Sequence, residues 1–306
     1  MKVANGTTSD PQNGFVEYQF TDNSGLSREI QSAADTDKCL DLYKGSTVNG
    51  TNIQLFECTG RAPQQWVING MQVQLKKDPK KCIDLTGANT ESNTNIQLYD
   101  CYGDKARQFW IYDGFTGAFR SAKAYWKCLH LEGGSTANDT NIDLYSCTGT
   151  KKQQWVVQEA PPLVDKSCVY IMHLAHDMDI CLDLEGDNTN NASSKLIISE
   201  CTGTTDDDYQ HWVFGEQEHR IYLNNKDSGK CMNLYGGNTS GGTKINVHDC
   251  NDKARQRWIY DGLTQVFRSA VDLNKCIQVK NGDTADGTQV EIRTCDGSAA
   301  QQWVIE

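Results

Sequence analysis

Polar and aromatic side chains recur at fixed positions beside pairs of cysteines. Asp41 lies two positions after Cys39, and Gln54 and Phe56 lie four and two positions before the next cysteine. A carboxylate accepts hydrogen bonds from hydroxyl groups, an amide adds a second polar contact, and an aromatic ring offers a flat surface to C–H groups. This combination is suited to a neutral sugar, and it requires no metal ion and no other cofactor.

The same pattern returns in the following segment with Asp84, Gln97 and Tyr99. Both sets must be positioned by a β-hairpin, because strand-forming runs flank a turn that is rich in Gly, Asn and Thr. Side chains alternate between the two faces of a strand. We therefore expect Asp41 on the first strand and Gln54 on the second to share the face that carries the cysteines.

Twelve of the 13 cysteines form six pairs whose members are 19 or 20 residues apart. In an antiparallel hairpin the first and last residues lie side by side, at a distance that disulfide geometry accepts. Zinc is the alternative for paired cysteines, but it requires tighter CxxC spacings that the sequence lacks. The predicted disulfides are Cys39–Cys58, Cys82–Cys101, Cys128–Cys147, Cys181–Cys201, Cys231–Cys250 and Cys276–Cys295.

The tripeptide Gln-x-Trp occurs six times, and the steps between successive tryptophans are 44, 45, 57, 46 and 45 residues. We number these repeats as units 1 to 6. The long step spans residues 159–167, which hold two of the five prolines, and a segment that begins with DKARQ at 104 recurs at 252. A threefold unit has therefore been duplicated. We expect a tail at 1–25, domains at 26–159 and 168–306, and a linker at 160–167.

The fold class is predicted to be all-β, because short alternating runs between turns recur and no helical period is present. Three units in each domain must share one core. The six tryptophans, followed by apolar pairs such as Val156 and Val157, are expected to fill these cores and not to contact a ligand.

The order Cys-x-Asp, Gln-x-aromatic-x-Cys and Gln-x-Trp resembles the ricin B-type (R-type) lectins over almost the whole chain. The resemblance implies two tandem β-trefoil domains, with up to three pockets each for galactose or N-acetylgalactosamine. In similar proteins the Asp accepts bonds from sugar hydroxyls and the aromatic side chain stacks on the sugar ring. The motif Gln supports that Asp, and the residue before the Gln often assists.

Units 1 and 2 match the family pattern best. The carbohydrate-binding residues implied by the resemblance are Asp41, Gln54, Phe56 and Gln64 in unit 1, and Asp84, Gln97, Tyr99, Arg107 and Gln108 in unit 2. Unit 1 departs at one position, where Pro63 replaces the polar neighbour of the motif Gln. We therefore expect binding to be concentrated in the first domain.

The other four units depart further from the pattern. Weaker pockets are expected from His130, Asp143 and Tyr145 in unit 3, and from Asn233, Asn246 and His248 in unit 5. Unit 4 keeps Asp183 but has Ile197 and Ser199 in place of the amide and the ring, so we expect it to be empty. Unit 6 departs at all three positions and is expected to serve as scaffold; its residues there are Gln278, Glu291 and Arg293.

Several other functions are disfavoured by composition and motifs. The net charge of -11 argues against nucleic acid as a partner. The sequence contains no run of about 18 apolar residues, so membrane insertion is not expected. No HExxH, GxSxG, phosphate-loop or nucleotide-binding glycine motif indicates an enzyme. His173 and His176 lie close together, but a strand would turn them to opposite faces, so no metal site is expected.

The cysteine pairs indicate a secreted or extracellular protein, although no signal peptide is visible at the N-terminus. The leading hypothesis is a free-standing lectin that binds glycans or glycoproteins containing galactose or N-acetylgalactosamine. The alternatives are the sugar-targeting module of a larger secreted enzyme or toxin, and trefoils that serve protein contacts. The sequence leaves open the oligomeric state and the role of Cys168, which has no partner within its repeat.

Overall fold

The structure, a computed structural model, describes residues 26–103, 105–158, 160–161, 163–165, 168–187, 189, 194–202, 209–215, 219–224 and 229–306. The predicted tail at 1–25 and part of the predicted linker lie outside these residues. None of the helices in the described ranges has the length and apolarity needed to cross a lipid bilayer.

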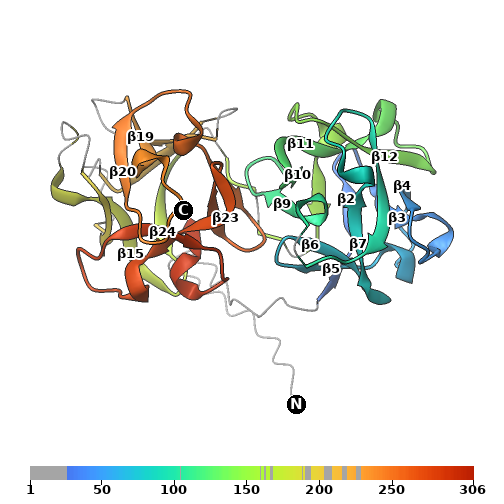
Figure 1. Ribbon diagram of the computed structural model, residues 1–306, viewed down its shortest axis with the longest axis horizontal. Coiled ribbons are helices and arrows are strands. Elements are labelled where there is room, and N and C mark those ends of the chain that lie inside the picture. The colour runs from blue at the N-terminus through green and yellow to red at the C-terminus, as the bar shows by residue number, and fades with distance from the viewer. Residues whose placement is uncertain are drawn as a thin grey trace, which may run out of the picture.

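Short strands dominate the described chain, which forms two lobes that lie side by side (Figure 1). The first lobe contains β1 (Ser27–Arg28), β2 (Ile30–Ser32), β3 (Asp35–Leu42), β4 (Thr51–Glu57), β5 (Trp66–Asn69), β6 (Gln72–Leu75), β7 (Asp78–Leu85), β8 (Thr94–Asp100), β9 (Trp110–Asp113), β10 (Ala118–Ser121), β11 (Ala124–Leu131), β12 (Thr140–Ser146) and β13 (Trp155–Val157).

The second lobe repeats this order. It contains β14 (Val169–Leu174), β15 (Asp177–Leu184), β16 (Leu196–Glu200), β17 (His211–Phe214), β18 (Ile221–Leu223), β19 (Lys230–Leu234), β20 (Ile245–Asp249), β21 (Trp258–Asp261), β22 (Val266–Ser269), β23 (Asp272–Val279), β24 (Val290–Thr294) and β25 (Trp303–Ile305).

Single turns of 3-10 helix connect the strands. They are η1 (Tyr43–Gly45), η2 (Ala62–Gln64), η3 (Thr86–Ala88), η4 (Ala106–Gln108), η5 (Glu132–Gly134), η6 (Lys151–Gln153), η7 (Glu185–Asp187), η8 (Tyr235–Gly237), η9 (Ala254–Gln256), η10 (Lys280–Gly282) and η11 (Ala299–Gln301). In each unit one such turn follows the first strand of the hairpin. In five of the units the structure describes a second turn, which carries the Gln of Gln-x-Trp.

Each lobe is organised around a threefold arrangement of hairpins. In the first lobe β4, β8 and β12 each pair with the other two, and β13 pairs with β2 to close the ring of strands. In the second lobe β25 closes onto β14 in the same way. Closure removes the unpaired edges that short strands would otherwise expose. The two lobes are thus the tandem β-trefoils that the family resemblance implies, each built from three of the repeats.

The six predicted cysteine pairs are disulfide-bonded in the structure. Their Cα–Cα distances lie between 5.0 and 5.2 Å, within the range that unstrained disulfides adopt. Each disulfide joins the first strand of its hairpin to the residue that follows the second. Every hairpin is therefore closed covalently next to the polar residues of interest.

The Gln-x-Trp motif holds each unit together through backbone hydrogen bonds. All six indoles are at most 3% exposed. Each donates from Nε1 to the carbonyl of the residue after the first cysteine of its unit, at 3.0–3.5 Å. The motif Gln accepts from the N–H directly after the second cysteine and donates to the carbonyl directly before it.

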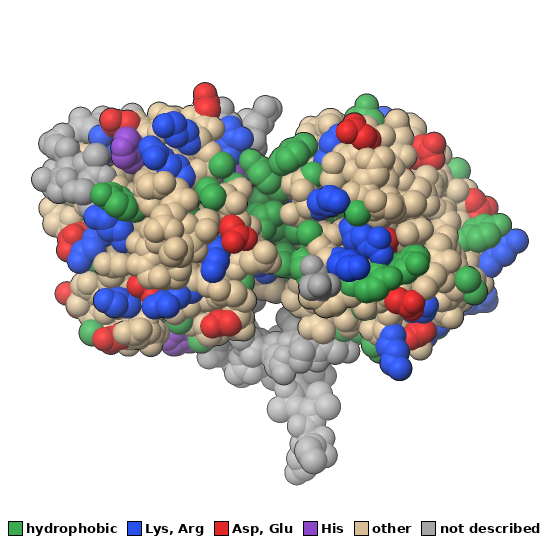
Figure 2. Space-filling view, viewed as in Figure 1, with side chains coloured by type: hydrophobic (Ala, Val, Ile, Leu, Met, Phe, Trp, Pro, Cys, Tyr) green, Lys and Arg blue, Asp and Glu red, His purple; other side chains and the backbone are tan. Residues whose placement is uncertain are grey.

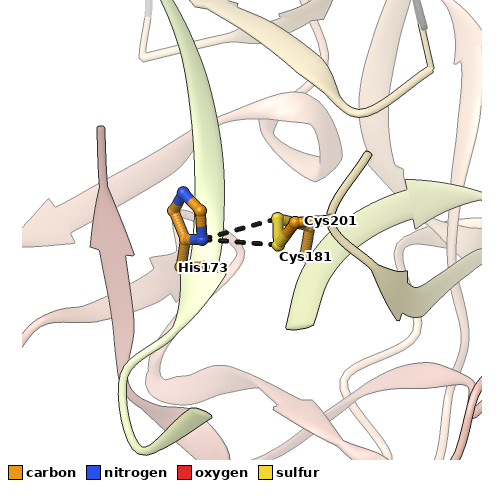
Figure 3. A group of neighbouring side chains, drawn as sticks. All are labelled: His173, Cys181 and Cys201. Carbon is orange, nitrogen blue, oxygen red and sulfur yellow. Dashed lines mark hydrogen bonds between the residues drawn. A yellow bond between two sulfur atoms is a disulfide. The ribbon is translucent and has the colours of Figure 1, made fainter. Parts of the chain in front are cut away.

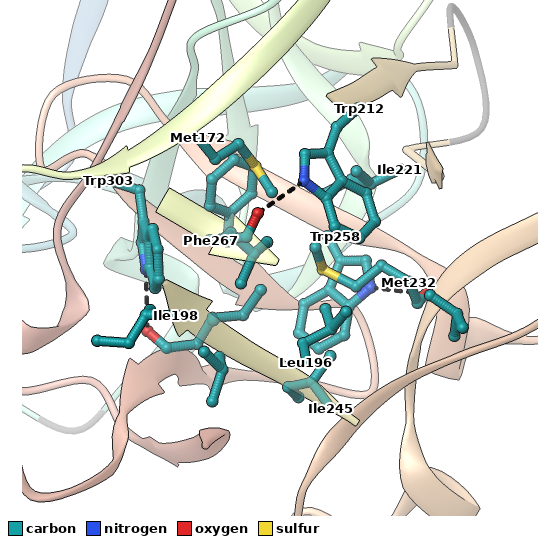
Figure 4. Close-up of a cluster of buried hydrophobic side chains, with 14 of the residues drawn as sticks. Met172, Leu196, Ile198, Trp212, Ile221, Met232, Ile245, Trp258, Phe267 and Trp303 are labelled. Carbon is teal, nitrogen blue, oxygen red and sulfur yellow. Dashed lines mark hydrogen bonds between the residues drawn. The ribbon is translucent and has the colours of Figure 1, made fainter. Parts of the chain in front are cut away.

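The tryptophans fall into two separate apolar clusters, one in each lobe, with three indoles in each. Figure 4 shows the second cluster, where Trp212, Trp258 and Trp303 surround the side chains of Met172 and Phe267. The expected core role of the apolar pair after Trp155 is only half correct. Val157 is buried, but Val156 is 42% exposed, because strand alternation turns one of two neighbours outward.

The two lobes meet through equivalent turns. The N–H of Gly114 donates to the carbonyl of Tyr260 at 3.0 Å, and the N–H of Gly262 donates to the carbonyl of Tyr112 at 2.9 Å. A Cβ atom on Gly114 would lie 2.7 Å from the Tyr260 ring and 2.9 Å from the Cα of Gly262. Glycine is therefore required at this contact by the close approach of the two backbones.

Candidate functional site

Each hairpin places one polar residue of its first strand opposite one residue of its second. The register pairs Asp41 with Gln54 and Asp84 with Gln97, as strand alternation predicts. Two 3-10 turns of the same unit lie beside this pair and approach each other closely. In unit 1 a Cβ atom on Gly45 would lie 3.0 Å from the ring of Pro63, and Gly45 has a φ of +63° that favours glycine.

Unit 1 presents a carboxylate that is nearly buried but still reaches the surface. Asp41 is 8% exposed, and the Nε2 of Gln54 donates to its Oδ1 at 3.0 Å. Burial raises the pKa of Asp41 above its ordinary value, and hydrogen bonds from Gln54 and Gln64 partly oppose this rise. Phe56 pairs with Cys39 across the strands and is half-buried.

Unit 2 surrounds its carboxylate completely. Asp84 has no exposed surface; its Oδ1 accepts from Gln97 at 2.9 Å, and its Oδ2 accepts from Gln108 at 2.9 Å. The Nε of Arg107 forms an ion pair with the same Oδ2 at 2.9 Å. Arg107 is therefore positioned over the carboxylate that is expected to accept bonds from a sugar, and Asp84 is less accessible than Asp41.

The guanidinium of Arg107 also lies over two aromatic rings. Its central carbon is 5.4 Å from the ring centre of Tyr99 and 4.9 Å from that of Tyr102. Tyr102 was not expected from the motif comparison. One signal was present in the sequence, because the residue directly after the second cysteine is Thr, Asn or Asp in the other five units.

Unit 3 brings its three expected residues together, with the carboxylate on the opposite strand. The Nδ1 of His130 lies 2.8 Å from Oδ1 of Asp143, and the rings of His130 and Tyr145 are 4.9 Å apart. The Oδ2 of Asp143 is buried and has no hydrogen-bond partner among the described residues. Burial raises the pKa of Asp143, and the hydrogen bond from His130 opposes the rise.

Unit 4 satisfies its carboxylate internally. Asp183 accepts from the hydroxyl of Ser199 at 2.5 Å, from Gln210 at 3.0 Å and from the backbone N–H of Leu184 at 2.6 Å. These three bonds leave few acceptor sites for a ligand.

Units 5 and 6 contain amide and charged pairs in place of the Asp and Gln. In unit 5 the amide of Asn233 donates to Asn246 at 2.7 Å, whereas the ring nitrogen of His248 contacts the carbonyl of the next residue. In unit 6 Arg293 forms a 2.7 Å ion pair with Glu291. His248 follows Asn246 by two positions on β20 and pairs with Cys231 across the strands.

His173 contacts a disulfide and not a set of free ligands. Its Nδ1 lies 3.5 Å from the sulfur of Cys181 and 3.4 Å from that of Cys201, as Figure 3 shows. These three residues form the one group of potential metal ligands in the described ranges. Both sulfurs are bonded to each other, so neither is a thiolate that could bind a metal ion.

Two closed rings of hairpins, each with polar residues beside three disulfides, define a tandem β-trefoil protein. A family model for the ricin-type β-trefoil lectin domain matches residues 71–168 and 168–303, more than half of the chain. A second model, for a ricin-type β-trefoil lectin domain-like family, matches residues 16–99. The chain belongs to the ricin-type β-trefoil lectin family, whose domains bind carbohydrate.

Several solved structures are similar to this chain at low identity. A mosquitocidal holotoxin is 17% identical over 96% of this chain and 35% of that chain, with a TM-score of 0.40. The agglutinin from Abrus precatorius is 18% identical over 94% of this chain and 98% of that chain, with a TM-score of 0.38. The C-half of the earthworm R-type lectin in complex with GalNAc is 15% identical over 43% and 96%, with a TM-score of 0.38.

The chain spans about a third of the length of the mosquitocidal toxin chain. No curated protein matches it.

Proposed function

We propose that this protein is a lectin for glycans with terminal galactose or N-acetylgalactosamine, and that binding is concentrated in units 1 and 2. The observation that carries the proposal is the pair of buried carboxylates, Asp41 and Asp84, each held by an amide of the facing strand beside an aromatic ring. We further propose that the functional domains are residues 26–159 and 168–306, joined by 160–167.

The chemistry of these pockets fits a neutral sugar. In unit 1 the bond from Gln54 fixes the orientation of Asp41, and in unit 2 the bonds from Gln97 and Gln108 to the two oxygens of Asp84 do the same. The fixed carboxylate would accept bonds from two neighbouring hydroxyls, while Phe56 or Tyr99 would cover the C–H face of the sugar ring. In unit 2 the Arg107 side chain, which is 21% exposed, must move off Asp84 before a hydroxyl can take its place.

The first lobe is favoured because the second offers no equivalent set among its described residues. Unit 4 has Ile197 and Ser199 in place of the amide and the aromatic ring, and unit 5 has a neutral Asn pair. A shallow pocket of this kind should bind a monosaccharide with a Kd of about 1 mM, which corresponds to about 4 kcal/mol. Useful affinity would come from several pockets of one rigid protein that engage the same glycan surface.

Secretion is part of the proposal. Six disulfides form and persist in oxidising compartments, and their reduction in the cytosol would remove the main covalent constraint on every unit. The expected partners are therefore extracellular glycans and glycoproteins.

The test is a calorimetric titration with methyl galactoside and N-acetylgalactosamine. The wild type is compared with the double variant Asp41→Ala, Asp84→Ala, and with Asp183→Ala as a matched loss of one buried carboxylate. We expect saturable binding by the wild type and by the Asp183 variant, and none by the double variant. Near-UV circular dichroism establishes that each variant is folded.

Two results would contradict the proposal in different ways. Binding that persists unchanged in the double variant would place the sites outside units 1 and 2. Absence of binding by the wild type to both sugars and to a broad glycan panel, together with no haemagglutination, would reject the lectin function for this chain.

A further inference from the structure

A cleft lies between the two lobes, and the function proposed above does not use it. It has a volume of about 350 Å³ and is lined by segments from both lobes. Figure 2 shows hydrophobic side chains gathered at the junction of the lobes. Trp126 and Tyr125 belong to the wall from the first lobe, and Val271, Asp272 and Asn274 belong to the wall from the second.

Trp126 is unusual among the seven tryptophans of the chain. It is 57% exposed, whereas the other six are at most 3% exposed. It lies two positions before the first cysteine of unit 3 on β11. The equivalent residues of the other units are polar or glycine: Asp37, Lys80, Asp179, Gly229 and Asn274. No packing role in the trefoil therefore requires an indole at this position.

Contacts from both lobes hold the aromatic wall of the cleft in place. The ring of Tyr125 meets that of Trp126 edge-on, with centres 5.3 Å apart and an interplanar angle of 78°. The guanidinium of Arg257, from the second lobe, donates to the hydroxyl of Tyr125 at 3.4 Å. Arg120 donates to the backbone carbonyl of Tyr125 at 3.0 Å. The Trp126 indole therefore packs against a Tyr125 ring that both lobes hold in position.

The composition of the cleft suits a pyranose ring. An exposed indole is a flat apolar surface for the C–H face of a sugar, and its N–H is a hydrogen-bond donor. Asp272 and Asn274 offer acceptors on the opposite wall, and Lys123 adds a donor.

The cleft adjoins η4, one of the turns that build the candidate pocket of unit 2. Ala106 lines the cleft, and the next two residues on η4, Arg107 and Gln108, contact Asp84. Lys123 also lines the cleft, and its Nζ donates to the carbonyl of Ala88 on η3 at 2.6 Å. Because η4 contributes to both the cleft and the pocket, and Lys123 of the cleft contacts η3, a glycan in that pocket could extend into the cleft.

We propose that the cleft is an extended subsite, in which Trp126 stacks on the sugar residue adjoining a terminal sugar held at Asp84. This inference rests on the lectin function proposed above. It predicts that the protein prefers oligosaccharides to monosaccharides, and that the preference depends on Trp126.

The test compares monosaccharides with galactose- and N-acetylgalactosamine-terminated oligosaccharides of two to four residues. The best oligosaccharide is expected to bind the full-length wild type about tenfold more tightly than the monosaccharide. Trp126→Ala should weaken the affinity for this oligosaccharide about fivefold to tenfold and leave the affinity for the monosaccharide unchanged. Trp126→Phe should retain most of the oligosaccharide affinity. Val169→Ala, at an apolar site that is 46% exposed, is the matched control and should have no effect.

Fluorescence gives a second readout that reports on this one residue. Because Trp126 is the sole exposed tryptophan, it dominates the component that acrylamide quenches, and Trp126→Phe supplies the baseline. Oligosaccharides should protect Trp126 from quenching and monosaccharides should not. Asp84→Ala should abolish this protection, because the terminal sugar would lose its anchor.

Four results would overturn the inference. The first is that the protein binds monosaccharides and oligosaccharides with equal affinity and that Trp126→Ala changes neither; this result would contradict the subsite but not the lectin function. The second is protection that persists in Asp84→Ala, which would separate the cleft from unit 2. The third is self-association that Trp126→Ala abolishes, which would make the cleft a protein contact. The fourth is absence of binding to any glycan, which would reject the inference and the proposed function together.

Discussion

Replacement of the Gln of unit 2 tests how the buried carboxylate is held. Gln108 has no exposed surface and makes three hydrogen bonds: it accepts from the N–H of Tyr102 at 2.6 Å, and it donates to the carbonyl of Asp100 at 2.8 Å and to Asp84 at 2.9 Å. Gln108→Ala removes all three. The two backbone bonds are worth about 1 kcal/mol each, and a bond to a buried charge is worth about 1.5–3 kcal/mol.

The matched variant is Gln153→Ala in unit 3 of the same lobe. Gln153 makes the same two backbone bonds, to Thr148 at 2.6 Å and to Ser146 at 2.8 Å, and also accepts from the exposed hydroxyl of Thr148 at 3.0 Å. The position equivalent to Asp84 in that unit is His130, which bonds to another residue. We expect Gln153→Ala to lower the free energy of unfolding by about 2–3 kcal/mol, and Gln108→Ala to lower it by about 3.5–5 kcal/mol.

Urea unfolding of the two variants measures this difference, since both positions lie in one lobe and share its cooperative transition. A double-mutant cycle refines it. In an Asp84→Asn background the cost of Gln108→Ala should exceed that of Gln153→Ala by only about 1 kcal/mol or less, because the bond then lost at position 84 is a neutral one. Equal losses for the two single variants, or an unchanged excess in the Asn background, would refute the claim that Gln108 stabilises the charge of Asp84.

Three further perturbations follow from the geometry. In an Asp84→Ala background, sugar affinity should fall on acidification at a pH above the ordinary Asp value, because the raised pKa of Asp41 means earlier loss of the ionised acceptor; calorimetry across pH measures this. Replacing Cys82 and Cys101 by Ser should cost about 3 kcal/mol in urea unfolding. Gly114→Ala should cost about 1–3 kcal/mol and separate the lobes, which small-angle scattering would detect as a larger radius of gyration.

Each of these predictions has its own control. The negative charge of Asp139 contributes to the raised pKa of Asp41. Asp139→Asn should therefore shift the loss of sugar affinity on acidification to lower pH. The contribution of Asp41 to the free energy of unfolding should fall as pH rises through its folded-state pKa, because the folded state binds the Asp41 proton more tightly than the unfolded state does. Gly103, where an added Cβ meets nothing within 4 Å, is the control for Gly114. Unchanged scattering for Gly114→Ala, or no stability loss in the cysteine variant, would contradict those two predictions.

Local pattern determined the hairpins, the disulfides and the cores of this protein. The pairing of Asp41 with Gln54 follows from the two-residue period of a strand and from the cysteine spacing that sets the hairpin register. The burial of the six Gln-x-Trp tryptophans follows from their size and from the need of three units to share one core. These properties depend on neighbours that are close in sequence or repeated in it, so the sequence alone was enough to predict them.

The tertiary structure alone decided which pockets are open and what lies between the lobes. Arg107 covers Asp84 because its side chain can reach both the carboxylate and the ring of Tyr99, a choice of rotamer that spacing does not encode. The cleft beside Trp126 exists because residues about 150 positions away form its second wall. Such contacts depend on how two folded surfaces meet, and no periodicity within either surface specifies that arrangement.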